Sequence, residues 1–208
     1  FYVRGDATEA LAAIKEGVEE AAAAGLTGAI ACHVQASYPT PISGEETAII
    51  DALEGQDGHP QVSPPYPEEM GLMGQPTLLD SVETLALIPT VAASEEAADG
   101  FRSSGLSGAT GWSYFTAAGA VAYPGVYRAP LGTPVEQLLA RAGAAAGLTA
   151  VLPGGMASGP LFPDELHLPL DYESLQRVGS TLGNRALVAI DSSASWLQRV
   201  AELGGWLA

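Results

Sequence analysis

The sequence predicts an α/β fold in two parts, and three observations support this class. Leu11, Ile14 and Val18 are spaced so that their apolar side chains share one face of a helix. Helical and strand-like runs then alternate through the first half of the chain. After about residue 105, short strands separated by turns replace the long helical runs, which indicates a small mixed sheet.

The first helix is expected to begin with a capping box formed by Asp6 and Glu9 and to end at Gly25. A strand is expected over Ala29–Val34, where apolar residues follow one another. Cys32 lies within this run, so we expect its thiol to be a small buried apolar group.

Further along the first half, a second helix is expected over Glu45–Glu54 and is stopped by Gly55. A segment rich in proline and glycine, residues 56–76, follows as an irregular loop. A third helix is predicted from near Asp80, and Pro89 should end or kink it.

The glycine and serine residues of Ser103–Gly111 predict a boundary between two parts. A hairpin is expected next, with Pro124 and Gly125 in its turn. Thr133, Pro134 and Glu136 then predict a helix start with a threonine N-cap and a proline in the first position. The remaining expected elements are strands over Trp112–Ala118, Val126–Arg128, Ala150–Leu152 and Ala186–Ile190, and a final helix over Ser193–Leu203 carrying Trp196, Val200 and Leu203 on one side.

The charge balance excludes one large class of partners. Among 208 residues, 24 are acidic and 8 are basic, and Lys15 is the only lysine. Nucleic-acid binding depends on cations that neutralise phosphates, so the sequence argues against it and favours a solubilised acidic surface. No apolar run is long enough to span a bilayer, and no export signal opens the chain, so we expect a cytoplasmic protein. The chain does not begin with methionine, which indicates either processing or a piece of a longer sequence.

Common catalytic and metal motifs do not occur. His33, His59 and His167 have no zinc-site spacing, and Cys32 alone supplies neither a disulfide nor the thiolates of an iron–sulfur cluster. The sequence also has no G-x-G-x-x-G, P-loop or G-x-S-x-G pattern. The glycine-rich segment Leu152–Gly159 has two readings: a loop whose amides hold an anion, or a tight turn, which is the more economical one.

An ordered series of short segments resembles one protein family. The segments are Val3–Gly5, Gly44–Ala48, Leu53–Gly55, Pro64–Pro67, Gly71–Leu72, Pro76–Thr77, Val82–Leu85, Pro124–Tyr127, Pro130–Thr133, Leu152–Gly155, Tyr172–Gln176, Gly179–Ser180 and Leu182–Gly183. In this order they are similar to the NADH-oxidising, flavin-binding subunit of respiratory NADH dehydrogenase, complex I. Each segment alone is weak evidence, whereas the ordered series covers nearly the whole chain.

The resemblance implies a fold and a cellular setting. It assigns residues 1–105 to part of a Rossmann-like domain for flavin mononucleotide (FMN) and NADH, and residues 106–191 to a ubiquitin-like β-grasp domain. Residues 192–208 would begin a C-terminal helix. The implied chemistry is hydride transfer from NADH to FMN, in a subunit that binds other complex I subunits peripherally at the inner face of the bacterial membrane.

By resemblance, the positions expected to contact FMN and NADH are Gly44, Glu45, Glu46, Tyr66, Asp80 and Ser81. Several of these positions also have an ordinary structural explanation. Ser43 with Glu46 has the spacing of a capping box, as does Asp80 with Glu83. Tyr66, between prolines, is equally typical of a loop anchor.

Departures from the family pattern predict an impaired site. Pro39 and Pro41 replace a glycine-rich run, which removes two backbone donors. Ser63 stands where the family has a lysine, and Asp80 with Ser81 replaces a pair of asparagines. The family's phosphate loop and its cluster-binding cysteines do not occur in this sequence, so we expect no iron–sulfur cluster. The chain by itself is therefore predicted to be inactive, and the alternative is a non-catalytic relative that serves assembly or interaction.

Overall fold

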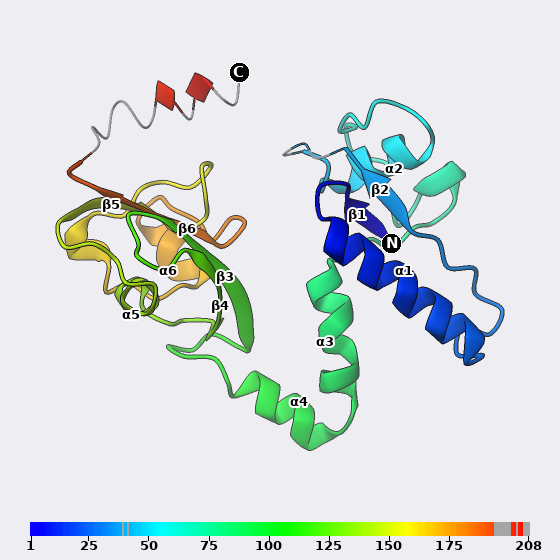
Figure 1. Ribbon diagram of the computed structural model, residues 1–208, viewed down its shortest axis with the longest axis horizontal. Coiled ribbons are helices and arrows are strands. Elements are labelled where there is room, and N and C mark those ends of the chain that lie inside the picture. Colours follow the sequence, from blue (N-terminus) through cyan, green and yellow to red (C-terminus); the bar gives the residue numbers. More distant parts are fainter. Residues whose placement is uncertain (39, 41, 194–200, 203, 206–208) are drawn as a thin grey trace. The chain divides into compact units, whose positions relative to one another are not determined.

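The computed structural model describes residues 1–38, 40, 42–193, 201, 202, 204 and 205. The chain forms two compact units, Phe1–Thr84 (the first unit) and Leu85–Ala208 (the second unit). The predicted α/β class is confirmed, because the first unit holds a parallel strand pair with helices and the second a four-stranded mixed sheet with helices (Figure 1). The domain boundary near residue 105 stays a prediction.

The first unit opens with a strand–helix–strand arrangement. Strand β1 (Tyr2–Arg4) pairs in parallel with β2 (Gln35–Ser37), and helix α1 (Thr8–Ala23) connects them (Figure 1). Parallel strands need such a crossover because a tight turn only joins antiparallel ones. The two strands form a sheet of their own within the described residues.

The predicted start of α1 is wrong and its predicted end is confirmed. Ala7 is the N-cap and no side chain caps the helix, because the Asp6 carboxylate instead pairs with the Arg4 guanidinium at 2.5 Å. That ion pair also lowers the pKa of Asp6. At the other end, Gly25 has a positive φ of 70°, and its N–H donates to the Ala22 carbonyl at 3.0 Å. This geometry favours glycine over residues with a side chain.

The strand expected over Ala29–Val34 is wrong, because those residues form turns and loop. The strand begins at Gln35, where pairing with β1 becomes possible: the Gln35 N–H donates to the Phe1 carbonyl at 2.9 Å. Cys32 is consequently exposed and not the buried apolar group expected. Tertiary pairing, which a local apolar run does not reveal, decides where this strand lies.

Three further elements complete the first unit and lead out of it: α2 (Glu46–Leu53), the 3₁₀ turn η1 (Leu72–Gly74) and α3 (Val82–Ala92), which continues into the second unit. Gly55, with a positive φ of 83°, follows the C-cap of α2 and stops the helix, as predicted. Helix α3 does not end at Pro89 but includes it. Proline removes one N–H from the helical ladder, and here the following residues still complete another turn.

The second unit holds helix α4 (Glu95–Arg102), strands β3 (Trp112–Gly119) and β4 (Gly125–Pro130), helix α5 (Val135–Arg141), strand β5 (Leu148–Leu152), the 3₁₀ turn η2 (Pro163–Glu165), helix α6 (Tyr172–Arg177) and strand β6 (Ala186–Asp191). The strand order is β4-β3-β6-β5, in which β3 and β6 are parallel and the other pairs antiparallel. All four strands were predicted, whereas α4 and α6 were not.

One continuous apolar core supports this sheet. It contains Phe115, Ala129, Val135, Leu138, Leu139, Val151, Leu161, Leu170, Leu175, Leu182, Leu187 and Ala189. The strand residues of the core share one face of the sheet. Ala189 of β6 pairs with Val151 of β5 and with Gly119 of β3, and Gly119 faces the same side as Phe115 because the two are an even number of residues apart. The core residues of α5 and α6 therefore cover the same face of the sheet.

The start of α5 differs from the prediction in its cap. Pro134 is the N-cap, and the buried Thr133 hydroxyl donates to the Pro130 carbonyl at 2.7 Å in place of capping the helix. The final helix expected over Ser193–Leu203 falls largely outside the described residues, as do Pro39 and Pro41. Across the described parts of the chain, no helix combines the length and apolar character needed to cross a bilayer.

Candidate functional site

The first candidate site surrounds the start of α2, where the resemblance places Gly44, Glu45 and Glu46. Glu45 is the N-cap residue of the helix. Its carboxylate oxygen Oε2 accepts hydrogen bonds from the Ala48 N–H at 2.8 Å and from the Thr47 hydroxyl at 2.6 Å. Glu46 lies exposed in the first turn, and Gly44 is exposed before it. The capping box predicted for Ser43 and Glu46 is therefore wrong, because Glu45 itself caps the helix.

These contacts set the charge state of Glu45. Burial alone raises the pKa of its carboxyl group, but hydrogen bonds from Thr47 and from the Ala48 amide outweigh burial and leave the pKa lowered. The group is thus a carboxylate at neutral pH. Two hydrogen bonds are accepted by its oxygen Oε2, and the backbone amides of Glu46 and Thr47 lower the pKa of the group further.

A hydrogen-bond network ties α2 to the loop that follows it. The Asp51 oxygen Oδ2 accepts from the Gly58 and His59 amides at 2.9 and 3.0 Å. The Gln61 amide donates to the Thr47 hydroxyl oxygen at 2.7 Å, and its side-chain nitrogen reaches Asp51 Oδ1 at 3.3 Å. This network was not predicted from the sequence, because it joins residues whose partners lie up to 14 positions apart. It fixes the loop against the helix.

An open pocket of about 460 Å³ lies beside this network. Its lining consists of Thr47, Ile50, Asp51, Glu54, Gln61, Val62, Pro65, Pro67, Met70, Gly71 and Gly74. The charged groups of this lining are carboxylates, and one of them, Glu54, accepts from the Met73 amide at 2.7 Å. None of the six positions singled out by resemblance belongs to the lining, although Glu46 and Tyr66 are adjacent in sequence to residues that do, and Glu45 accepts a hydrogen bond from the lining residue Thr47.

The remaining predicted positions lie on exposed surface. Tyr66 is 50% exposed, and the Asp80 and Ser81 side chains are exposed as well. The Ser81 hydroxyl oxygen accepts from the Thr84 amide at 3.1 Å, so Ser81 caps α3. The capping pair predicted for Asp80 and Glu83 is wrong for this reason.

The charge of this region bears on whether FMN or NADH fits it. No lysine or arginine occurs between Lys15 and Arg102, a stretch that includes every predicted contact position. Both cofactors carry phosphate groups, which proteins hold with cations or with converging backbone amides. The polar groups brought together around α2 are mainly carboxylates. The predicted contact positions therefore have no lysine or arginine near them in sequence to pair with a phosphate group.

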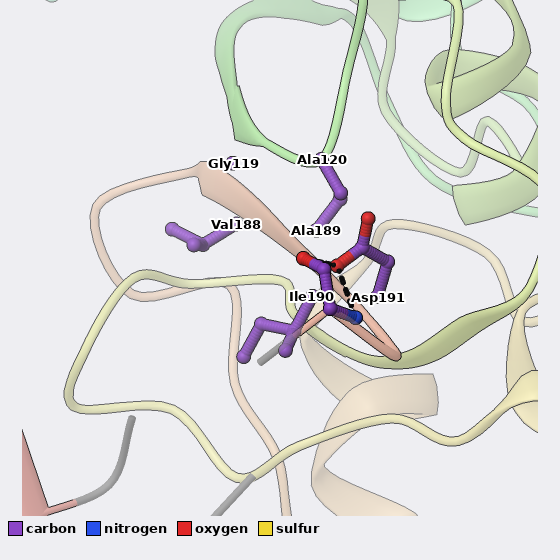
Figure 2. A pocket seen from close by; sticks show the side chains of 7 residues that line it. Gly119, Ala120, Val188, Ala189, Ile190 and Asp191 are labelled. Carbon is purple, nitrogen blue, oxygen red and sulfur yellow. Dashed lines mark hydrogen bonds between the residues drawn. The ribbon is translucent and has the colours of Figure 1, made fainter. Parts of the chain in front are cut away.

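A second pocket, of about 490 Å³, lies in the second unit, and Figure 2 shows its labelled residues. The lining comprises Gly119, Ala120, Val188, Ala189, Ile190, Asp191 and Ser193. The Asp191 oxygen Oδ1 accepts from the Ser193 amide at 3.0 Å and from its hydroxyl at 2.5 Å. The other side chains are small or apolar, so this pocket offers space for an apolar group and no set of reacting residues.

The glycine-rich segment Leu152–Gly159 is a closely packed turn. The Gly154 amide donates to the Ser158 hydroxyl oxygen at 3.1 Å, and the Gly155 amide donates to the Ala186 carbonyl at 2.8 Å. A Cβ on Gly154 would lie 2.3 Å from the Thr181 carbonyl oxygen. The amides proposed to hold an anion are thus used internally, which favours the turn.

Metal-binding groups do not converge in the described residues: no three of their histidine, cysteine, aspartate or glutamate side chains are placed to share an ion. His33, His59 and His167 are each exposed. His167 Nδ1 lies 2.8 Å from the Asp164 carbonyl oxygen.

Comparison with known families and proteins gives consistent results. The SLBB domain family matches residues 114–155, within the second unit. The F subunit of NADH-quinone oxidoreductase in Streptomyces coelicolor is 38% identical over 96% of this chain and 46% of its own length. The corresponding F subunits of Mycobacterium tuberculosis and Rickettsia typhi are 39% and 33% identical over 96% and 98% of this chain. The chain spans about half the length of these relatives.

A solved structure agrees with these relatives over both units. An NAD⁺-reducing [NiFe]-hydrogenase in its H₂-reduced state contains a chain that is 26% identical, with a TM-score of 0.85. The match covers 99% of this chain and 35% of that one. The air-oxidised state of an NAD⁺-reducing [NiFe]-hydrogenase matches with a TM-score of 0.82.

Proposed function

Since this chain is a homologue of the F subunits of NADH-quinone oxidoreductases over nearly its whole length, we propose that it serves as the equivalent component of a complex I-like enzyme. Its partners would be the other subunits of that enzyme, in a peripheral position at the inner face of the bacterial membrane. The reaction of the assembled enzyme would be NADH oxidation. Acceptance of a hydride from NADH is the chemistry that FMN would supply in such an enzyme.

The role of this chain's own residues is positional. Glu45 keeps an ionised carboxylate at the start of α2, and such a group would accept a hydrogen bond from a ribose hydroxyl or an amide of the nucleotide. Asp51, Thr47 and Gln61 would hold the loop that carries Tyr66 next to it. Gly44, Glu46, Asp80 and Ser81 remain proposed contact positions on the surrounding surface.

The observation that carries the finer part of the proposal is the absence of lysine and arginine from residue 16 to residue 101. With carboxylates around α2 and Ser63 in place of a lysine, these residues would leave both phosphate-bearing cofactors without a charge partner. We therefore propose that this polypeptide alone takes up neither FMN nor NADH, and that it holds no iron–sulfur cluster.

A second candidate function is that of a non-catalytic assembly or interaction subunit. It is favoured by a contrast between the two units. The region around α2 has no lysine or arginine, whereas the second unit has a packed apolar core and would keep a partner-binding role after loss of the redox site. Both candidates share the same ancestry and differ in whether hydride transfer takes place in the assembly.

A titration of the purified chain with FMN and then NADH tests the proposal, with the Streptomyces coelicolor relative as the comparison. We expect no flavin absorption band to remain with this chain after gel filtration. A yellow protein whose band bleaches on addition of NADH would contradict the impaired site. Co-purification with other oxidoreductase subunits in a flavin-free, inactive complex would favour the assembly role over the catalytic one.

A further inference from the structure

One surface of the second unit carries a cluster of aromatic rings and an arginine, which we call the arginine–aromatic face. Its members are Phe101, Trp112, Tyr114 and Arg128. The Trp112 ring meets Phe101 edge-on, with centroids 6.1 Å apart, and meets Tyr114 at 5.6 Å and 87°. The Arg128 guanidinium carbon lies 3.5 Å from the centre of the Trp112 ring. This distance is that of a stacked cation–π pair.

The face lies opposite the apolar core. Side chains alternate between the two faces of a strand, so Trp112 and Tyr114 point away from the side on which Phe115 is buried. Tyr114 and Arg128 are direct cross-strand neighbours on β3 and β4. Tyr114 is 48% exposed, and Val126, farther along β4 on the same face, is 69% exposed. This face therefore presents exposed apolar surface at Val126.

The arginines of this acidic chain differ in whether they form an ion pair. Three arginines each pair with a carboxylate: Arg4 with Asp6, Arg102 with Asp99 and Arg177 with Glu173. Among the described residues, neither Arg128 nor Arg141 makes such a pair.

These two arginines are also neighbours. An Arg141 nitrogen donates to the Arg128 carbonyl at 3.1 Å, and the Arg141 guanidinium carbon lies 5.5 Å from the centre of the Tyr127 ring. Tyr127 packs against the core, so the Arg141 guanidinium lies on the core side of β4, whereas the Arg128 guanidinium lies on the arginine–aromatic face. Neither has an ion-paired carboxylate among the described residues, although acidic residues outnumber basic ones 24 to 8.

We propose that the arginine–aromatic face, with Arg141 across the edge strand β4 from it, is a docking surface for an acidic segment of a partner protein. Tryptophan, tyrosine and arginine are the residues that contribute most binding energy at protein interfaces. A guanidinium stacked on a ring keeps its N–H edge free for two parallel hydrogen bonds to a carboxylate. Val126 and Tyr114 supply apolar surface beside it, so the segment carries aspartate or glutamate interspersed with aliphatic residues.

A labelled peptide of alternating glutamate and leucine tests the proposal, with the glutamine–leucine peptide as its neutral counterpart. The chain's net charge of −16 repels an acidic peptide in general, so binding requires a local cationic site. We expect the acidic peptide to bind more tightly than the neutral one and to shift the amide resonances of Val126 and Arg128.

Replacing both arginines, Arg128→Ala with Arg141→Ala, is expected to weaken binding at least about tenfold. The matched control replaces two exposed, ion-paired arginines, Arg102→Ala with Arg177→Ala, and is expected to change the affinity by less than about twofold. Arg128→Lys, which keeps the charge and loses the planar fork, should give an intermediate affinity if the arginine stacks and forks as proposed.

Three outcomes would overturn the proposal: equal binding of the acidic and neutral peptides, equal weakening in both double variants, or displacement of the peptide by inorganic phosphate at millimolar concentration. The last outcome would reveal a general anion site. Circular dichroism of each variant distinguishes lost binding from a lost fold.

Discussion

The two units of this chain use similar elements and bury them very differently. In the second unit, side chains from four strands and from α5 and α6 meet in one apolar core. In the first unit, the apolar side chains buried among the described residues are Val3, Ala48 and Pro67, and α1 contributes no buried residue. Several large apolar side chains of that unit are exposed, including Leu26 at 80% and Val62 at 91%.

This contrast indicates which unit is the more stable by its own packing. Burial of apolar surface supplies most of the free energy of folding, and a two-stranded sheet with one helix buries little of it. A parallel pair is also normally found inside a larger sheet covered on both faces. We therefore expect the first unit to open at a far lower free energy than the second. The F-subunit relative of Streptomyces coelicolor is about twice as long as this chain.

The largest expected effect is that of emptying the second unit's core. Phe115→Ala removes a ring that is completely buried, so the free energy of unfolding of this unit should fall by about 3 to 5 kcal/mol. The comparison is Ile14→Ala on α1, which should cost less than about 1 kcal/mol because that side chain is only half-buried. Urea unfolding followed by hydrogen exchange in each unit measures both. Equal losses would break the comparison.

A smaller effect is expected from a close backbone approach in the second unit. Gly119 has φ 84°, and a Cβ there would lie 2.1 Å from the Ala189 carbonyl oxygen. Gly119→Ala should therefore destabilise the unit by about 2 to 3 kcal/mol. Gly125→Ala is the matched variant, because no atom lies within 4 Å of its Cβ position and its φ is not positive. If the two variants were equally stable in thermal unfolding, the tight β3–β6 packing would be refuted.

In the first unit, the cap of α2 is the contact with the clearest expected cost. Glu45→Ala leaves the Ala48 amide without its acceptor, which should destabilise the helix by about 1 kcal/mol. Glu46→Ala, at the exposed neighbouring position, should change it by less than about 0.5 kcal/mol. Exchange rates of the α2 amides report the difference. A larger effect of Glu46→Ala than of Glu45→Ala would show that Glu45 is not the cap of α2.

The smallest expected effect is the pH dependence of the same cap. The pKa of Glu45 is lower in the folded chain than in the unfolded one, so its contribution is present above the unfolded value of about 4.3. It is lost as the pH falls through the folded value, because protonation then removes the ionised acceptor. Exchange of the α2 amides measured from neutral to acidic pH should show this loss, and Glu45→Gln should abolish that part of the pH dependence. Faster exchange as the pH rises, after correction for intrinsic rates, would contradict this sign.

The comparison also explains how far sequence reasoning reached. The four strands of the second unit were predicted because apolar runs and turn residues mark a sheet whose core they fill. In the first unit, Ala29–Val34 has the same local pattern but lies outside the strand, because pairing with β1 fixes the strand at Gln35. Local patterns identified the strands best where burial was complete.

Helix starts were harder to predict, because competing partners decide them. Asp6 pairs with Arg4 in place of capping α1, and Glu45 takes the cap position assigned to Ser43. Around the candidate site, Glu45 lies at the start of α2 and Tyr66 in the loop that follows, and their contacts with a cofactor stay a prediction. The Gly58 and His59 amides donate to Asp51 and hold that loop. These hydrogen bonds depend on the path of the loop, so no spacing in the sequence predicts them.

Hydrogen exchange of the whole chain, with and without FMN, tests the central claim most directly. We predict strong protection of the β3 and β6 amides, weak protection of the β1, β2 and α1 amides, and no change in either unit when FMN is added. Protection of the β1 and α1 amides equal to that of β3 would contradict the lower stability of the first unit. Protection that rises on addition of FMN would contradict the impaired nucleotide site.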